Sequence, residues 1–368
     1  MRPGEEAFLA HALRLGARGN GQTWPNPSVG CLLVKDGRIV ARAVTAPGGR
    51  PHAETQALAR AGGAARGSTA FVSLEPCAHE GTTPSCAAEL AKAGVACVVT
   101  AAEDPDPRTA GAGHARLHAA GVEVVPARAS EAAQQAHRGF FSRIERGRPW
   151  LTLKLATSAD GRIATATGES RWITGPSARR MVHAMRARAD AVLVGGGTAR
   201  ADDPALTVRG FGEVSQPVRI VASRRLDLPE DGRLSARAGV TEAGPLWLCH
   251  GPDATEARRA FWRGRGATML DVPIGSGPHL DPNGLLRALG ERGLGEVLCE
   301  GGGAFAASLL GAGLVDELVT FTAGLTLGAE GKPGLGALGI DRLAEAPRFA
   351  LVEERRVGPD VRAVWRPV

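Results

Sequence analysis

Residues 69–101 read TAFVSLEPCAHEGTTPSCAAELAKAGVACVVTA, a stretch in which two apolar runs flank one helical segment. The run at residues 69–74 predicts a β-strand, residues 86–93 predict a helix, and the run at residues 96–101 predicts a second strand. A strand, a helix and a strand in this order are typical of an α/β layered sheet.

The sequence on either side continues this alternation. The Asp36-Gly37 turn signal predicts a hairpin of strands 29–34 and 38–44. Residues 130–146 predict a connecting helix, which Gly147-Arg148-Pro149 breaks, so we expect a first domain over residues 1–146. Its other predicted elements are helices at residues 5–15, 52–60 and 113–120, and a strand at residues 122–125.

The rest of the chain, residues 147–368, predicts a second α/β domain. A length of 368 residues is about twice the usual domain size of roughly 100 to 200 residues, which favours two domains with separate cores. The predicted strands are residues 151–156, 191–194, 218–222, 246–249 and 297–299, and the predicted helices are residues 177–188, 254–263 and 304–310.

The composition is that of an ordinary globular chain. Apolar residues make up 43% and charged residues 22%, which excludes disordered, fibrous and collagen-like classes. The 44 Lys and Arg exceed the 38 Asp and Glu by 6, and the basic residues are dispersed along the chain. Because this positive charge is dispersed, we expect anionic small molecules as substrates. Aromatic residues are only 4%, so we do not expect nucleic acid as a partner, and we expect no membrane partner either.

The N-terminus predicts no signal peptide, since Met-Arg-Pro-Gly-Glu-Glu lacks an apolar core. No stretch approaches the roughly 20 apolar residues that span a bilayer. We therefore expect a cytoplasmic protein, in which six cysteines do not form a disulfide framework. Four of them lie in apolar, strand-like runs and predict small buried core residues: Cys31, Cys97, Cys249 and Cys299.

The other two cysteines belong to a candidate metal site. His52 and Cys86 each start a predicted helix, and Cys77 follows a predicted strand. Because a helix N-terminus favours anions, the cysteines can be held as thiolates. One histidine and two cysteines leave the fourth tetrahedral position of one Zn²⁺ open for water, as in catalytic sites. A closed structural site is the alternative, with His79 or a distant cysteine as fourth ligand.

Glu54 is placed to move protons at this site, two residues from His52. Hydrolytic attack on an amino-substituted ring carbon needs a group that takes the proton of water and passes it to the leaving nitrogen. The pattern H-x-E followed by a P-C motif is the signature of zinc nucleobase deaminases. Here eight residues separate Cys77 from Cys86, where that signature has two.

These motifs resemble the bifunctional riboflavin-biosynthesis deaminase/reductase family. Its deaminase half carries H-A-E and P-C-[SA]-H-x-G-x-T-P-x-C, which residues 52–54 and 76–86 match, and its other motifs are similar to residues 26–30 and 104–107. The resemblance implies a cytidine-deaminase-like N-terminal domain. It also implies zinc on His52, Cys77 and Cys86, proton transfer by Glu54, and substrate contacts by Asn26, His79 and Asp104. For Asn26, a simple turn residue before proline is the alternative.

Two positions depart from the family pattern. Thr45 stands where the family has a histidine seven residues before the zinc histidine, and Asp106 stands where Asp-Pro-Asn-Pro has asparagine. Both departures could change how the substrate is held, and neither touches the predicted zinc ligands or Glu54.

Two glycine clusters predict a ligand site in the second domain. Glu300-Gly301-Gly302-Gly303 follows a predicted strand and precedes a helix, where free N–H groups suit a phosphate. Gly195-Gly196-Gly197-Thr198 predicts a second turn after another strand, and open α/β sheets bind ligands at such strand ends. The usual dinucleotide fingerprint is missing, and a tight glycine turn without a ligand is the alternative.

Residues 154–161 and 168–174 resemble the reductase half of the same family, which implies a dihydrofolate-reductase-like C-terminal domain that uses NADPH. The resemblance covers nearly the whole chain, from about residue 5 to residue 361. It implies NADPH contacts by Ala156, Trp172, Thr198, Asp202, Ser223, Gly302 and Gly303, and substrate contacts by Ser170, Arg186, Leu206, Arg209 and Glu300.

Arginines of the second domain are candidates for binding phosphate. The guanidinium forks of Arg186 and Arg209 suit a ribose phosphate, although Arg186 could instead lie on a solvated helix face. We also hypothesise that Arg224 and Arg225 recognise the 2′-phosphate of NADPH. Lys154 lies near the predicted pocket, and its role stays open.

The sequence therefore predicts two steps of riboflavin synthesis: zinc-dependent deamination of a diaminopyrimidinone ribosyl phosphate, then NADPH-dependent reduction of its ribosyl group to ribityl. One alternative is a nucleic-acid base deaminase with an unrelated second domain. Another is that one half has lost its chemistry and serves as a binding module. The family is commonly oligomeric, which implies a homo-oligomer.

Overall fold

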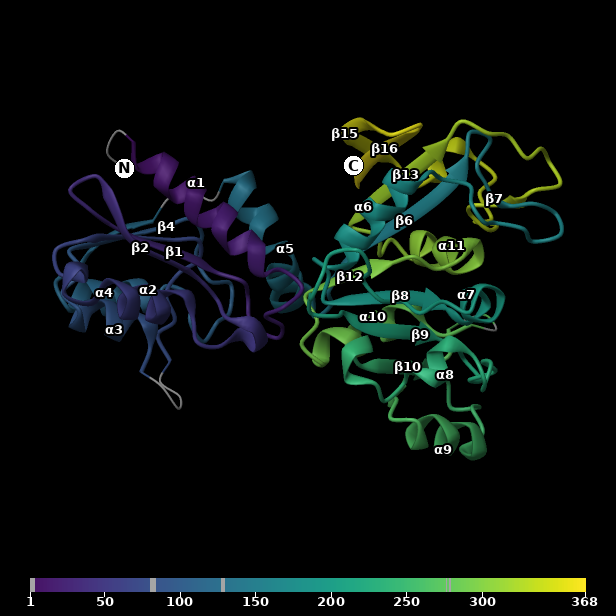
Figure 1. The fold of residues 1–368 in the computed structure, drawn as a ribbon, viewed down its shortest axis with the longest axis horizontal. Coiled ribbons are helices and arrows are strands. Elements are labelled where there is room, and N and C mark those ends of the chain that lie inside the picture. The colour runs from purple at the N-terminus through teal and green to yellow at the C-terminus, as the bar shows by residue number, and fades with distance from the viewer. Residues whose placement is uncertain (1–3, 80–83, 127–129, 276, 278) are drawn as a thin grey trace. The chain divides into compact units, whose positions relative to one another are not determined.

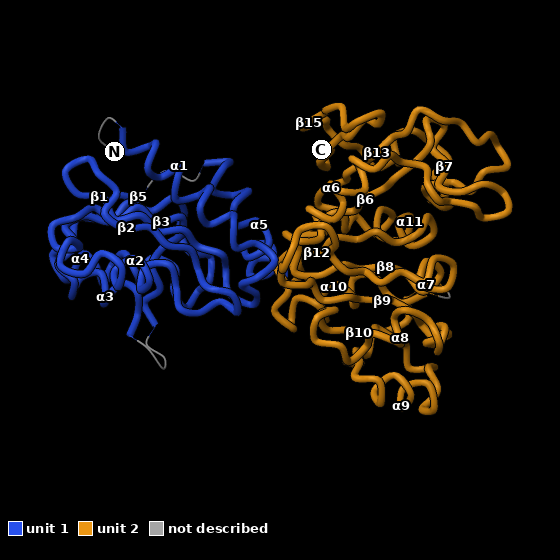
Figure 2. The backbone as a smooth tube through the Cα atoms, in the orientation of Figure 1, with its two compact units in different colours: residues 1–147 blue, residues 148–368 orange. Residues whose placement is uncertain are grey.

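The computed structural model describes residues 4–79, 84–126, 130–275, 277 and 279–368 (Figure 1). It divides into two compact units, Met1–Gly147 and Arg148–Val368, drawn in two colours in Figure 2. Residues 80–83, in the middle of the predicted zinc loop, lie outside the described residues.

Unit 1 contains a mixed five-stranded sheet. β1 pairs antiparallel with both β2 and β3, whereas β3, β4 and β5 pair parallel. It follows that β2, β3, β4 and β5 run in one direction, so their C-terminal ends lie at one edge of the sheet. The order is β2-β1-β3-β4-β5, with bounds Arg38–Val44, Gly30–Lys35, Thr69–Val72, Cys97–Thr100 and Glu123–Pro126.

Helices cover both faces of this sheet. Figure 1 shows α2, α3 and α4 on one face and α1 on the other. The predicted helices and the hairpin are confirmed, with boundaries shifted by one or two residues. The helices are α1 (Glu5–Gly16), α2 (Ala53–Ala61), α3 (Cys86–Lys92), α4 (Ala112–Ala119) and α5 (Glu131–Arg146), with 3-10 turns at Ala17–Gly19, Pro47–Gly49 and Gly62–Ala65.

The description of α5 as a connecting helix is wrong. Ala133 and Phe141 of α5 are buried in the core of unit 1, and the helix packs against α1. Its apolar face is therefore part of the first unit, because exposing that face along a linker would leave hydrophobic area in water.

Unit 2 contains a nine-stranded sheet that is parallel except at one end. The predicted strands β6, β8, β9, β10 and β12 are confirmed within this sheet. The edge strand β15 escaped prediction because its short apolar run, Phe349 to Val352, is followed directly by four charged residues, and most of the strand is exposed. The order is β11-β10-β9-β8-β12-β6-β13-β16-β15, with bounds Thr268–Asp271, Leu246–His250, Val218–Ala222, Ala191–Gly195, Glu296–Cys299, Trp150–Ser158, Glu317–Ala323, Asp360–Pro367 and Phe349–Val357.

A small second sheet of unit 2 pairs β7 (Arg162–Ala164) with β14 (Lys332–Pro333). The helices of unit 2 are α6 (Pro176–Arg186), α7 (Gly196–Asp202), α8 (Arg233–Ala236), α9 (Glu256–Gly264), α10 (Pro282–Glu291) and α11 (Gly303–Gly311), with 3-10 turns at Thr241–Ala243 and Leu343–Glu345.

The second predicted glycine turn is corrected by the structure. α7 begins at Gly196, directly after β8, so this cluster starts a helix. A Cβ on Gly196 would lie 2.9 Å from the Ser223 hydroxyl oxygen, so glycine lets the helix start against the end of β9.

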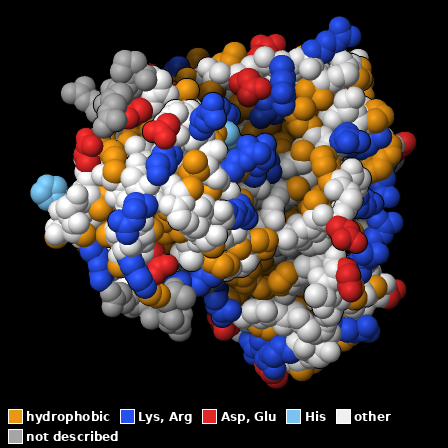
Figure 3. All heavy atoms as spheres, turned by 60° about the vertical axis from the view of Figure 1, so that its left-hand side comes forward, with side chains coloured by type: hydrophobic (Ala, Val, Ile, Leu, Met, Phe, Trp, Pro, Cys, Tyr) orange, Lys and Arg blue, Asp and Glu red, His pale blue; other side chains and the backbone are white. Residues whose placement is uncertain are grey.

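The four cysteines in apolar runs are buried, as predicted; their exposed fractions lie between 0% and 4%. No helix in the described ranges is long and apolar enough to cross a bilayer. On the face drawn in Figure 3, Lys and Arg side chains lie scattered among hydrophobic and uncharged ones.

A buried ion pair holds the beginning of unit 2. The Asp316 carboxylate accepts hydrogen bonds from Arg148 Nη1 and Nη2 at 2.7 and 2.8 Å and from the Leu151 backbone at 2.7 Å. The Asp316→Ala variant removes the carboxylate from a guanidinium that is itself mostly buried. We expect the free energy of unfolding of unit 2 to fall by about 3 to 5 kcal/mol. Chemical denaturation of the full chain measures it.

The exposed pair Arg342 and Glu345 provides the control. Glu345→Ala should cost less than about 1 kcal/mol, because solvent screens exposed ion pairs. Equal losses in the two variants would contradict a stabilising role specific to Asp316.

His137 predicts an acid sensitivity of unit 1. It is 3% exposed, its Nε2–H donates to the Ser73 carbonyl at 2.8 Å, and burial lowers its pKa to about 4. Because the unfolded pKa is about 6.5, the unfolded chain binds the proton first as pH falls. Stability is therefore full above about pH 6.5 and is lost towards pH 4.

The variant His137→Gln keeps a donor without titrating. Between about pH 7.5 and pH 5, wild type should lose about 2 kcal/mol more unfolding free energy than this variant. Thermal and chemical unfolding at the two pH values measure the difference. The exposed His118 of α4 supplies the control His118→Gln, whose pH slope should match wild type.

Two candidate active sites

Three potential metal ligands meet at the carboxyl edge of the unit 1 sheet. His52 follows β2 and stands directly before α2, Cys77 lies in the loop after β3, and Cys86 is the first residue of α3. Their ligand atoms all lie within 4.8 Å of one another. His52 Nδ1 is 3.3 Å from Cys86 Sγ and 3.7 Å from Cys77 Sγ. The strand directions thus bring together residues up to 34 positions apart.

These distances fit a zinc ion. With Zn–S near 2.3 Å and Zn–N near 2.0 to 2.1 Å, tetrahedral geometry places nitrogen and sulfur about 3.6 Å apart. The two measured N···S distances, 3.3 and 3.7 Å, bracket that value. His52, Cys77 and Cys86 can therefore hold the ion without rearrangement of the backbone.

The cysteine pair carries negative charge at neutral pH. A hydrogen bond from the Cys86 thiol lowers the pKa of Cys77 to about 4, and the same bond together with burial raises the pKa of Cys86. The Cys86 backbone N–H also donates to Cys77 Sγ at 3.3 Å. The hydrogen bond to Cys77 raises the pKa of His52. The site is therefore already polarised towards binding a cation.

Glu54 lies in the first turn of α2 and is 3% exposed. Burial raises the pKa of Glu54 to about 7, and the positive charge of His52 opposes that increase. A carboxyl group that titrates near neutrality both accepts and returns a proton with little driving-force penalty. The pKa of Glu54 and its place two residues after His52 therefore suit proton transfer.

The residues expected to hold the deaminase substrate lie on loops connected to this cluster. The Asn26 amide donates to the Gly49 carbonyl at 3.2 Å, in the segment that leads to His52. Asp104 follows β4, the parallel neighbour of β3, and burial raises its pKa to about 6, with Cys77 among the nearby charges. His79 is exposed and lies close enough to Asp106 to lower its pKa, after the larger contribution of Arg108.

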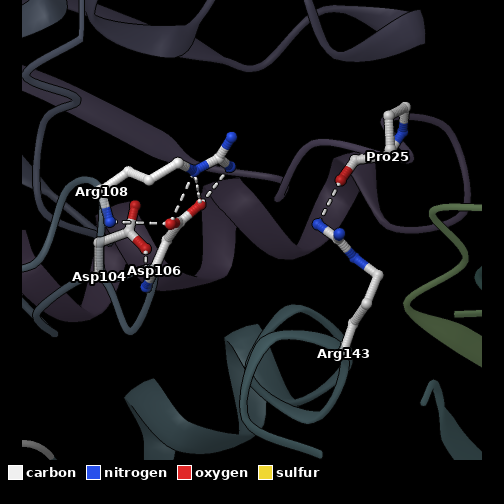
Figure 4. A network of polar contacts seen from close by, with 5 residues as sticks. All are labelled: Pro25, Asp104, Asp106, Arg108 and Arg143. Carbon is white, nitrogen blue, oxygen red and sulfur yellow. Dashed lines mark hydrogen bonds and ion pairs between the residues drawn. The ribbon is translucent and has the colours of Figure 1, made fainter. Parts of the chain in front are cut away.

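The two departures from the family pattern have structural partners. The Thr45 hydroxyl accepts a hydrogen bond from the Val29 backbone at 3.0 Å, and Thr45 is buried. Asp106 forms a two-pronged ion pair with Arg108, while its backbone N–H donates to Asp104 (Figure 4). Thr45 thus stabilises the backbone at Val29, and Asp106 binds an arginine at the surface.

The second site lies at the carboxyl edge of the unit 2 sheet. β8 and β12 are parallel neighbours, and the chain leaves them in opposite directions, towards β9 and towards β13. Such a switch point forms a crevice that binds ligands. The two glycine segments approach closely here: the Gly302 N–H donates to the Thr198 hydroxyl at 2.7 Å, and a Cβ on Gly301 would lie 3.1 Å from the Gly195 nitrogen.

A cavity of about 1040 Å³ opens at this crevice. Leu206 does not line it; its side chain is 2% exposed and packs in the core of unit 2, so it could reach a ligand only through its backbone. The other predicted residues of this site all line the cavity: Ala156, Ser170, Trp172, Arg186, Thr198, Asp202, Arg209, Ser223, Glu300, Gly302 and Gly303.

Arg186 does not lie on a solvated helix face. Its Nε and Nη2 donate to the two Glu300 oxygens at 2.6 and 3.0 Å, and its side chain is 13% exposed. Burial raises the pKa of Glu300, but Arg186 and Lys154 more than offset it and leave it below its usual value. Lys154 also lines the cavity, and burial lowers its pKa. In the cavity wall, the negative charge of Glu300 is therefore balanced by the positive charge of Arg186.

Among the cavity residues that the sequence did not single out are two cationic or titratable ones, His183 and Lys332. His183 lies three positions before Arg186 on α6, so helical spacing could have placed them on one face. Its Nδ1 accepts a hydrogen bond from the Arg209 backbone at 3.2 Å. Lys332 lies on β14, and no local pattern places it beside the cavity, because β14 is only two residues long.

Comparison with known proteins identifies the family of both units. Residues 3–102 match the cytidine and deoxycytidylate deaminase zinc-binding region, and residues 149–363 match the RibD C-terminal domain. The chain is 42% identical to the riboflavin biosynthesis protein RibD of Escherichia coli, over 97% of this chain and 98% of that protein.

Two solved structures match nearly the whole chain. RibD of Acinetobacter baumannii is 34% identical with a TM-score of 0.88, and the match covers 99% of both chains. The Thermotoga maritima enzyme, a diaminohydroxyphosphoribosylaminopyrimidine deaminase and 5-amino-6-(5-phosphoribosylamino)uracil reductase, is 30% identical with a TM-score of 0.85, over 99% of this chain and 98% of that one. The predicted cytidine-deaminase-like domain followed by a dihydrofolate-reductase-like domain is thereby confirmed. This chain belongs to the RibD family, the bifunctional deaminases and reductases of riboflavin biosynthesis.

Proposed function

We propose that residues 1–146 form a zinc-dependent deaminase domain and residues 147–368 an NADPH-dependent reductase domain. The first would deaminate a diaminopyrimidinone that carries a phosphoribosylamino group, and the second would reduce the ribosyl group of the deaminated product to ribityl. The observation that carries the proposal is the His52, Cys77 and Cys86 cluster with Glu54 beside it, on the same chain as a switch-point cavity. It remains a prediction that the substrates are small molecules, that the protein is cytoplasmic and that it forms a homo-oligomer.

In deamination, the proposed role of unit 1 is to hold the ring beside the metal ligands and to move protons. A zinc ion bound to His52, Cys77 and Cys86 would activate the attacking water. Glu54 would accept a proton from that water and donate it to the leaving nitrogen, a role that its pKa near 7 supports. Asn26, His79 and Asp104 would orient the pyrimidine and its substituent.

In reduction, the proposed role of unit 2 is to orient two ligands in one cavity. NADPH, when bound, supplies the hydride. The N-terminus of α11 at Gly303 offers a backbone N–H group to a phosphate of the cofactor, while the Gly302 N–H holds the Thr198 hydroxyl beside it. Arg186, already fixed by Glu300, and Arg209 would hold the phosphate of the substrate.

The order of the two steps is tested by product analysis. Incubated with the diaminopyrimidinone phosphate, the purified holoenzyme should form only the deaminated product without NADPH, and the deaminated and reduced product with it. Glu54→Gln should lower the deamination rate by at least about 100-fold, since it removes the proton carrier. Mass spectrometry identifies the products.

Two further readouts make this test specific. Glu54→Gln should keep one zinc per chain by elemental analysis, and it should reduce the pre-deaminated substrate at the wild-type rate. Normal deamination by a zinc-loaded Glu54→Gln enzyme would refute the proton-transfer role. Deamination without any reduction would refute the role proposed for unit 2.

We further propose that Arg224 and Arg225 select NADPH over NADH. Both line the cavity just past β9, and their Nε atoms lie 2.9 and 3.2 Å from the same Asp253 oxygen. One carboxylate shared by two guanidinium groups leaves a net positive charge for a phosphate. The nearby Asp227, which could accept a ribose hydroxyl, is 2.8 Å from Arg200 and accepts a hydrogen bond from Ser223.

The double variant Arg224→Ala/Arg225→Ala should lower kcat/KM for NADPH by about 10- to 100-fold, while kcat/KM for NADH stays within about twofold. Steady-state kinetics with both cofactors measures the ratio. Arg258→Ala, which removes an arginine from α9 beside this pair but outside the cavity lining, is the control. An unchanged NADPH preference in the double variant would exclude this assignment.

A further inference from the structure

Glu75 is a buried acid that neither proposed reaction uses. It lies in the loop after β3, two residues before Cys77, and its side chain is fully buried. Its backbone N–H donates to the Ala102 carbonyl at 2.9 Å, which joins the loops that follow β3 and β4. A buried carboxylate needs hydrogen-bond donors to offset the loss of water, so its partners show what it holds.

The Glu75 carboxylate accepts four hydrogen bonds from one segment. Oε2 accepts from the backbone N–H groups of Asp104 and Gly111 at 3.2 and 3.0 Å. Oε1 accepts from those of Gly113 and His114 at 2.9 and 3.1 Å. The carboxylate therefore ties together both ends of the segment at residues 104–114, which includes the start of α4.

This segment and the Cys77 loop are also in direct contact. A Cβ on Gly113 would lie 1.9 Å from the Pro76 carbonyl oxygen, so only glycine lets α4 start here. Beyond Cys77, the Ala78 carbonyl accepts a hydrogen bond from Arg116 of α4 at 3.0 Å. α4 thus contacts the chain on both sides of Cys77.

The held segment presents its polar side chains in a defined arrangement. Asp104 Oδ1 accepts a hydrogen bond from the Asp106 backbone N–H at 2.9 Å, and the Asp106 carboxylate forms an ion pair with Arg108 (Figure 4). Each link starts from the backbone that Glu75 anchors at Asp104. A shift of that anchor would move Asp104, Asp106 and Arg108 together relative to Cys77.

We propose that Glu75 is a positioning residue for deamination, which sets the distance between the Cys77 ligand and the substrate-holding segment at residues 104–108. The proposal rests on the deaminase role proposed for unit 1. Glu75 contacts neither substrate nor metal; it acts through Asp104 and through the loop of Cys77. A misplacement of about 1 Å in such a pair is enough to lower kcat/KM by about 100-fold.

The test is Glu75→Gln in the zinc-loaded full chain. Its amide nitrogen would face two N–H donors where an oxygen now accepts them. We expect deaminase kcat/KM to fall by about 100-fold, mainly through a higher KM, because Glu54 and the ligands stay in place. Zinc content should stay at one per chain, the absorption spectrum of the Co²⁺-substituted protein should match wild type, and reduction of the pre-deaminated substrate should not change.

The neighbouring Glu103 gives a matched control, because it directly precedes this segment but is exposed. Glu103→Gln should keep the wild-type deaminase KM. A wild-type KM in Glu75→Gln would overturn the inference. If Glu75→Gln loses zinc as well, Glu75→Asp decides: retained zinc with a raised KM supports positioning, and loss of zinc there overturns it. A wild-type enzyme that does not deaminate would instead refute the proposed function.

Discussion

The direction of the strands decides where chemistry can occur in both units. In unit 1, β2, β3 and β4 point the same way, so the chains that carry His52, Cys77 and Asp104 emerge at one edge. In unit 2, the parallel neighbours β8 and β12 release two glycine-rich helix starts at one crevice. Parallel strands expose chain ends and helix N-termini together, which concentrates backbone donors and ligand side chains on one side of a sheet.

Buried carboxylates hold the segments between strands and helices in place across long sequence separations. Glu75 binds backbone N–H groups up to 39 positions away, Asp190 binds those of Gly295 and Glu296, and Asp360 binds that of Gly175. A carboxylate accepts several charge-assisted hydrogen bonds from loops that have no ladder partner. It therefore fixes irregular segments, where a β-sheet or helix could not, and it satisfies donors that burial would otherwise leave without water.

The two sites prepare for different ligands through their charges. The zinc cluster pairs two sulfurs so that one is a thiolate at neutral pH, and burial leaves Glu54 near its titration point. The reductase cavity instead balances its charges in advance: Glu300 holds Arg186 rigid, and Asp253 is shared by two arginines. Fixed guanidinium groups bind phosphate with little further ordering, whereas a cation site needs negative charge before the metal arrives.

Local patterns in the sequence determined most of the elements, the core cysteines, the motif that unites His52, Glu54, Cys77 and Cys86, and the glycine-rich start of α11, because apolar spacing and motif chemistry act over a few residues. Tertiary structure alone decided that Leu206 faces the core, that α7 starts at the second glycine cluster, that Lys332 reaches the cavity, and that Glu75 binds the segment at the start of α4. Each of these depends on which strands become neighbours and on hydrogen bonds between distant segments. Such contacts form only when the strands assemble into the sheets, so the residues that make them carry no local pattern.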